Sequence, residues 1–104
     1  MPIKSYQDDL LIRLKNANYA ATYLKTALDE MLKDGNTEAF LLALKNVLQA
    51  NGKVKDIATE ADITRHHLYR LLSEDGSPTL ATLVAVLNAV GLSIDFKPAP
   101  EGNS

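Results

Sequence analysis

The chain has 104 residues, of which 46% are hydrophobic and 23% charged, with a formal net charge of −2 and no cysteine. This length suits a single domain with one core, and the ordinary apolar and charged fractions exclude global disorder. The lack of cysteine excludes a disulfide framework, a thiolate metal site and a cysteine nucleophile. No apolar run is long enough for a membrane span and the N-terminus lacks a signal-peptide core, so we expect a soluble, cytoplasmic protein.

The first 36 residues predict two helices. Ser5 can cap a short helix that reaches about Lys15. The expected apolar stripe of this helix consists of Tyr6, Leu10 and Leu14. A longer helix from residue 17 has the i, i+3, i+4, i+7 spacing of an amphipathic helix and ends at Gly35, which can take a left-handed cap conformation. On this second helix Tyr19 and Tyr23 flank an alanine-rich stripe, where they either pack internally or face a protein partner.

The rest of the chain predicts shorter helices and one strand. A helix from residue 36 or 37 to Asn51 is apolar on much of its circumference and should lie at the centre of the fold. A loop follows at 74–78, and Thr79 caps a last helix that Gly91 closes. Residues 92–96 alternate apolar and polar, which predicts a strand, and residues 98–104 read as a flexible tail. We therefore expect an all-α fold of five to six short helices with one short C-terminal β-strand.

Residues 54–73 have the pattern of a helix-turn-helix. Ala58 is small enough for a close helix crossing, Asp62 tolerates a left-handed turn conformation, and Ile63 can insert into the core. Ile57 anchors the first helix. The second helix is expected to face inward through Leu68, Leu71 and Leu72.

The opposite face of this second helix carries residues suited to DNA. Its outward positions are Arg65, His66, Tyr69 and Arg70, with Thr64 at the N-cap. Arginine can bind guanine with two hydrogen bonds, while histidine, threonine and tyrosine can reach base edges or phosphates. A solvated surface is the alternative reading, because residues 53–72 have a net charge of only +1, from four cationic and three acidic side chains.

The adjacent histidines and the carboxylate pairs of the sequence do not predict a metal site or a catalytic site. His66 and His67 are adjacent, so their side chains diverge by about 100° on a helix and cannot chelate one ion. We expect one of them to point outward and the other to be half-buried. The carboxylate pairs, such as Asp8 and Asp9, are adjacent and near helix ends or loops, which does not suit general acid–base chemistry. We expect no enzyme activity, no metal and no cofactor.

The C-terminal elements predict a homodimer. The last helix has more apolar surface than one side can bury, and an isolated strand has no partner within the chain. The expected dimer interface consists of Val86, Val90, Leu92, Ile94 and Phe96. In the alternative, Leu92, Ile94 and Phe96 fold back onto the core of their own chain.

The segment from about Phe40 to Phe96 resembles the Cro-type, XRE-like helix-turn-helix domain, whose fold is that of lambda repressor. Nearly the whole chain is similar to the HigA-type antidotes of addiction modules, through YAATYLKTALDE at 19–30, the run at 39–92 and above all HHLYRLLSEDGSPTLATL. Asp62 departs from the glycine that the wider pattern favours. The resemblance implies an N-terminal helical extension at 1–36, a helix-turn-helix domain with a C-terminal strand at 37–97, and a tail at 98–104.

The resemblance also implies a function. A HigA-type antitoxin binds operator DNA as a dimer, represses its own operon and neutralises a RelE/HigB-like toxin ribonuclease. By position, the DNA-facing set is Thr64, Arg65, His66, Tyr69 and Arg70, with Lys53 and Lys55 on phosphates and Leu68 and Leu71 in the core. The alternatives are a protein-interaction module that does not read DNA, or a repressor of the same fold from a prophage or a restriction system, without a toxin partner.

Overall fold

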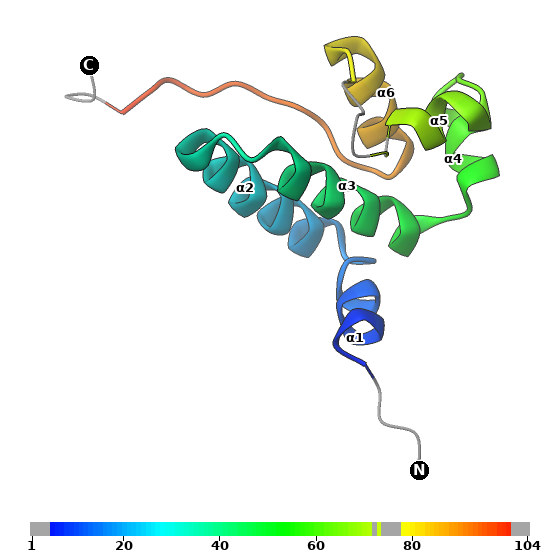
Figure 1. The fold of residues 1–104 in the computed structure, drawn as a ribbon, viewed down its shortest axis with the longest axis horizontal. Helices are drawn as coiled ribbons and strands as arrows, with labels where there is room; N and C mark the ends of the chain where they lie inside the picture. Colours follow the sequence, from blue (N-terminus) through cyan, green and yellow to red (C-terminus); the bar gives the residue numbers. More distant parts are fainter. Residues whose placement is uncertain (1–4, 72, 74–77, 101–104) are drawn as a thin grey trace.

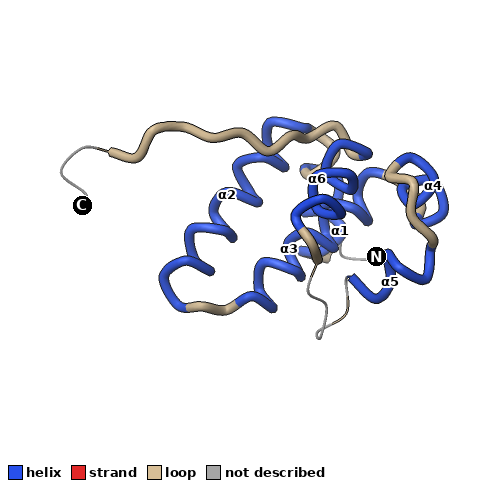
Figure 2. Tube along the Cα trace, turned by 90° about the horizontal axis from the view of Figure 1, so that it is seen from above, coloured by secondary structure: helices blue, strands red, loops and turns tan. Residues whose placement is uncertain are grey.

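The computed structural model describes residues 5–71, 73 and 78–100, and this part of the chain contains six helices. They are α1 (Tyr6–Arg13), α2 (Ala17–Asp34), α3 (Thr37–Asn51), α4 (Val54–Glu60), α5 (Arg65–Leu71) and α6 (Leu80–Ala89). The long helices α2 and α3 form an antiparallel hairpin, and the short helices α4, α5 and α6 gather at the end of α3 away from the hairpin loop (Figures 1 and 2). The predicted all-α fold is confirmed. The loop predicted at 74–78 lies, apart from Pro78, outside the described residues.

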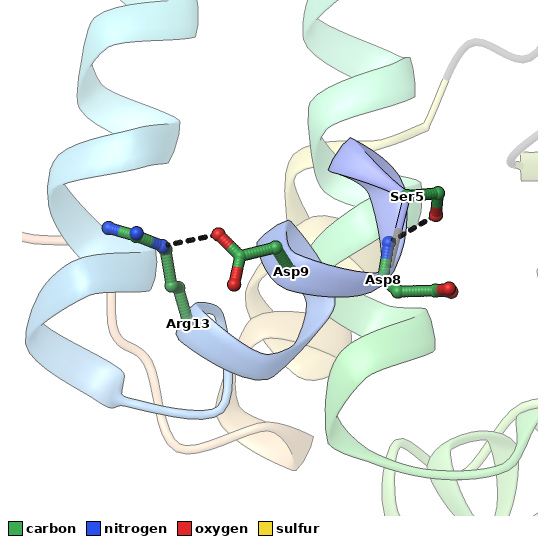
Figure 3. A network of polar contacts seen from close by, with 4 residues as sticks. All are labelled: Ser5, Asp8, Asp9 and Arg13. Atoms are coloured by element: carbon green, nitrogen blue, oxygen red, sulfur yellow. Dashed lines mark hydrogen bonds and ion pairs between the residues drawn. The ribbon is translucent and has the colours of Figure 1, made fainter. Parts of the chain in front are cut away.

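The helix starts follow the local capping residues. The Ser5 hydroxyl accepts a hydrogen bond from the Asp8 backbone N–H at 3.0 Å (Figure 3), so the cap predicted for α1 is confirmed. Asn16, Asn36 and Thr79 cap α2, α3 and α6 in the same way.

An ion pair adds to the local order of α1. The Arg13 Nε donates to Asp9 Oδ2 at 3.0 Å, one helical turn away (Figure 3). This hydrogen bond and the charge of Asp9 raise the pKa of Arg13 above its ordinary value. Because both side chains are about half exposed, the pair contributes little to stability.

Helix α3 is the centre of the fold, as its sequence predicts. It packs against α1, α2 and α4. Its buried residues are Leu41, Ala43, Leu44, Asn46, Val47, Leu48 and Ala50. The buried amide of Asn46 accepts a hydrogen bond from Gln7 Nε2 at 2.9 Å and donates to the Tyr23 hydroxyl at 3.1 Å. One side chain of α3 therefore fixes both N-terminal helices, and Tyr23 is an internal packing residue.

The N-terminal helices share the core of the rest of the chain. Leu10, Leu14 and Leu24 belong to the same buried cluster as the apolar residues of α3 to α6. The boundary predicted at residue 36 falls in the loop between α2 and α3, and the core is continuous across it. Tyr6 does not belong to the buried stripe that was expected for α1, because it is 81% exposed.

The C-terminal strand is not present, so this prediction is wrong. Residues 92–100 run as an extended segment without regular secondary structure, and Figure 1 shows this segment leaving α6 and passing along the α2–α3 hairpin. A strand needs a neighbouring strand for its ladder hydrogen bonds, and the described residues contain none. Leu92 is half-buried, and Leu92, Ser93, Ile94 and Asp95 all line a groove against α2 and α6, so the alternation of apolar and polar residues does not separate a buried from an exposed side. No helix in the described part of the chain is long and apolar enough to span a membrane.

Candidate nucleic-acid interface

Helices α4 and α5 are joined by a tight turn that the sequence makes possible. Asp62 has a φ of 59°, and it is the one non-glycine residue in the described chain with a left-handed backbone. After it, the Ile63 backbone N–H donates to the Ala58 carbonyl at 2.9 Å, which closes the end of α4. Ala58 is 2% exposed, and Ile63 packs against the core. The turn predicted from these three residues is confirmed.

The inward side of α5 is fixed by leucines. Leu68 is completely buried and Leu71 is 4% exposed, as predicted, while Leu72 lies outside the described residues. The Thr64 hydroxyl accepts a hydrogen bond from the His67 backbone N–H at 3.0 Å, so Thr64 is the N-cap of α5. These contacts leave little freedom in the rotation of α5 about its axis.

The outward side of α5 is polar and cationic. The side chains there are all exposed: Arg65, His66, His67, Tyr69 and Arg70. Tyr69 is 60% exposed although it is a large aromatic residue. The expectation that one of the two histidines is half-buried is wrong, because α5 touches the core through its leucine stripe alone. In the described part of the chain, no group of three His, Asp or Glu residues could hold a metal.

An open depression of about 800 Å³ lies beside this face, between α3, the start of α4 and α5. It brings together Lys53, Lys55, Arg65 and Tyr69 of the predicted set. Its lining does not include His66 or Arg70, which belong to a different flank of α5.

Two polar residues of α3 also line the depression and were not predicted. Lys45 and Gln49 are one helical turn apart and both exposed. The sequence places them on the polar side of α3, but only the packing of α3 against α4 shows that this side continues the α4–α5 surface.

The predicted dimer residues are distributed between the core and the surface. Val86 is completely buried within its own chain, because this side of α6 packs against α4, so it is not available to a partner. Val90 and Leu92 are half-buried against the same core. Ile94 is 37% and Phe96 87% exposed, and these two side chains are the accessible part of the predicted interface.

Comparisons with known proteins agree with an antidote. The model of a family described as "Probable addiction module antidote protein" matches residues 6–98. A curated protein of Haemophilus influenzae described as "Uncharacterized protein" is 40% identical over 70 residues, which cover 67% of this chain and 71% of that protein. No solved structure matches the chain.

Proposed function

Because the chain belongs to the family of probable addiction module antidote proteins, we propose that it neutralises a RelE/HigB-like toxin by direct binding and represses its own operon as a DNA-binding dimer. The observation that carries the DNA-binding part is the orientation of α5. Its leucines are buried, and its arginines, His66 and Tyr69 are exposed on a helix that a tight turn joins to α4.

The exposed face of α5 fits a major groove. The groove of B-DNA is about 12 Å wide and accepts one helix, and arginine is the side chain that reads guanine with two hydrogen bonds. The described part of the chain has two ion pairs, Arg13–Asp9 and Lys25–Asp29. Neither pair includes Arg65 or Arg70, so the charges of these two arginines are available to a ligand.

A dimer compensates for the low charge of one chain. With a net charge of −2 the protein has no general attraction for nucleic acid. Two copies of α5, set about one turn of DNA (~34 Å) apart, would double the cationic contacts in consecutive grooves. Ile94 and Phe96 on the extended C-terminal segment, and Leu80 at 64% exposure, offer apolar surface for such a dimer.

The toxin would bind a different surface. Tyr6, Ile12 and Tyr19 on α1 and α2 are 81%, 49% and 40% exposed. Aromatic side chains are enriched in protein interfaces, and α1 lies away from α4 and α5 (Figure 1). One chain could therefore hold DNA and toxin at the same time. The test is co-expression with the toxin encoded beside the gene. We expect relief of growth arrest and a stable complex on size-exclusion chromatography, and toxicity without a complex would contradict this part.

Alanine variants of Arg65 and Arg70 test the DNA-binding part, with Arg13→Ala on α1 as the control of equal charge change. Fluorescence anisotropy on the DNA upstream of the gene should show a loss of about 1–3 kcal/mol for each α5 variant, with fold and dimer intact. Affinities within about 1 kcal/mol of the wild type would refute the assignment of α5. Specific toxin binding without any DNA preference would favour the protein-interaction module, which the acidic pI of about 5.6 also favours.

A further inference from the structure

The depression between α3, α4 and α5 concentrates positive charge in an otherwise acidic protein. Four of the 11 lysines and arginines of the chain line it. They are Lys45, Lys53, Lys55 and Arg65. No carboxylate of the described residues contributes to its lining. A surface with one sign of charge attracts a ligand of the opposite sign.

These charges are not neutralised by ion pairs within the described chain. The two ion pairs in that part of the molecule are Arg13–Asp9 on α1 and Lys25–Asp29 on α2. Glu38 borders a neighbouring depression that Lys45 also lines, but these two side chains form no ion pair.

The walls of the depression combine a buried apolar base with exposed polar groups. Leu48, Ile57 and Leu68 are at most 4% exposed and contribute apolar surface to the lining. Gln49 and Tyr69 add side-chain hydrogen-bond donors at exposed positions. An apolar, low-dielectric base strengthens the field of the surrounding charges. Several cations and neutral donors together are typical of contacts to phosphate oxygens.

The position of the depression relative to α5 indicates which part of a DNA duplex it can hold. A helix with its side chains is about 10–12 Å across, which nearly fills a major groove of about 12 Å. With α5 in the groove, a sugar-phosphate strand must lie against each flank of the helix. Arg65 and Tyr69 form the flank that lines the depression, whereas His66 and Arg70 do not line it. The depression is therefore where one strand of the duplex would pass.

We propose that this depression holds the sugar-phosphate backbone of double-stranded DNA beside the groove that α5 enters, and that Lys45 and Gln49 of α3 contact that backbone. The inference rests on the proposed DNA-binding function and extends the DNA contacts from the α4–α5 segment to α3. Contacts of this kind position the protein without reading sequence. Lys45 therefore contributes affinity and salt dependence, and Arg70 contributes discrimination between sequences.

The test compares three full-length variants, Lys45→Ala, Lys33→Ala and Arg70→Ala. Lys33 is the matched control, because it is an exposed lysine in the last turn of α2, at the end of the hairpin away from α5 (Figure 1). Anisotropy is measured on the upstream DNA and on a scrambled duplex over a series of salt concentrations. Each lost phosphate contact should reduce the magnitude of the slope of log K against log salt by about 0.9. A Lys45→Ala dimer loses two such contacts, so the magnitude of its slope should fall by about 1.8.

We expect Lys45→Ala to weaken binding about equally on both duplexes, Lys33→Ala to change nothing, and Arg70→Ala to reduce the preference for the upstream DNA. In one outcome the wild type prefers the upstream DNA and Arg70→Ala reduces this preference, but Lys45→Ala has the same salt slope as Lys33→Ala. The proposed contact of Lys45 with the DNA backbone is then wrong, and the proposed function stands. If the wild type does not prefer upstream DNA, the proposed function fails and this inference fails with it. Equal competition by single-stranded RNA of the same sequence would also overturn the DNA assignment.

Discussion

The rotation of α5 about its axis can be tested at two adjacent positions. Leu68 is completely buried, whereas Tyr69 is 60% exposed. Replacement of an enclosed leucine by alanine removes buried methyl groups and leaves a cavity, which costs about 2–5 kcal/mol. Because Leu68 has no solvent-exposed side along which the site could collapse, we expect a loss of about 3–5 kcal/mol, above the lowest values of that range. Tyr69→Ala should change the free energy of unfolding by no more than about 0.5 kcal/mol.

Thermal unfolding followed by far-ultraviolet circular dichroism measures this difference. For a domain of this size 1 kcal/mol corresponds to about 4 °C or more in Tm, so Leu68→Ala should lower the Tm by at least about 12 °C. Both variants are compared at one protein concentration, because dimer formation makes the Tm depend on concentration. A Tyr69→Ala variant that loses as much stability as Leu68→Ala would refute this orientation, and Tyr69 could not then face DNA.

Substitutions at three further positions test the core and the turns. Asn46→Ala should cost about 1–3 kcal/mol in urea unfolding, because it removes the two hydrogen bonds that the buried Asn46 amide makes to Gln7 and Tyr23, and a loss below about 0.5 kcal/mol would contradict the hydrogen-bond network. Gly35→Ala should cost about 1 kcal/mol through the left-handed backbone alone, because no atom lies within 4 Å of the added methyl group. Asp62→Val should lower the Tm while Asp62→Gly keeps or raises it, and equal Tm values for the two would show that the turn does not need a left-handed residue.

The features that sequence predicted well are local ones. Ser5 and Thr79 start helices because the side chain of each accepts a hydrogen bond from the backbone N–H three residues along, and this signal needs no knowledge of the fold. The turn at Asp62 and the inward side of α5 at Leu68 are similarly encoded within a few residues.

The features that sequence predicted poorly depend on contacts between distant segments. Val86 lies on a helix that is apolar on most sides, so periodicity alone does not show which side the core covers. Residues 92–96 alternate between apolar and polar as a strand does, but the described part of the chain contains no strand with which they could pair. Lys45 joins the α4–α5 surface only through the packing of α3 on α4.

Operator binding is tested most directly by an anisotropy titration of the wild-type protein with the DNA upstream of its gene, at low and at near-physiological salt, with a scrambled duplex as the control. An operator-binding antidote should bind the upstream DNA tightly and in a salt-sensitive way, with two chains per site, and should bind the scrambled duplex more weakly. Equal affinity for both duplexes, or no binding at low salt, would contradict an operator-binding antidote.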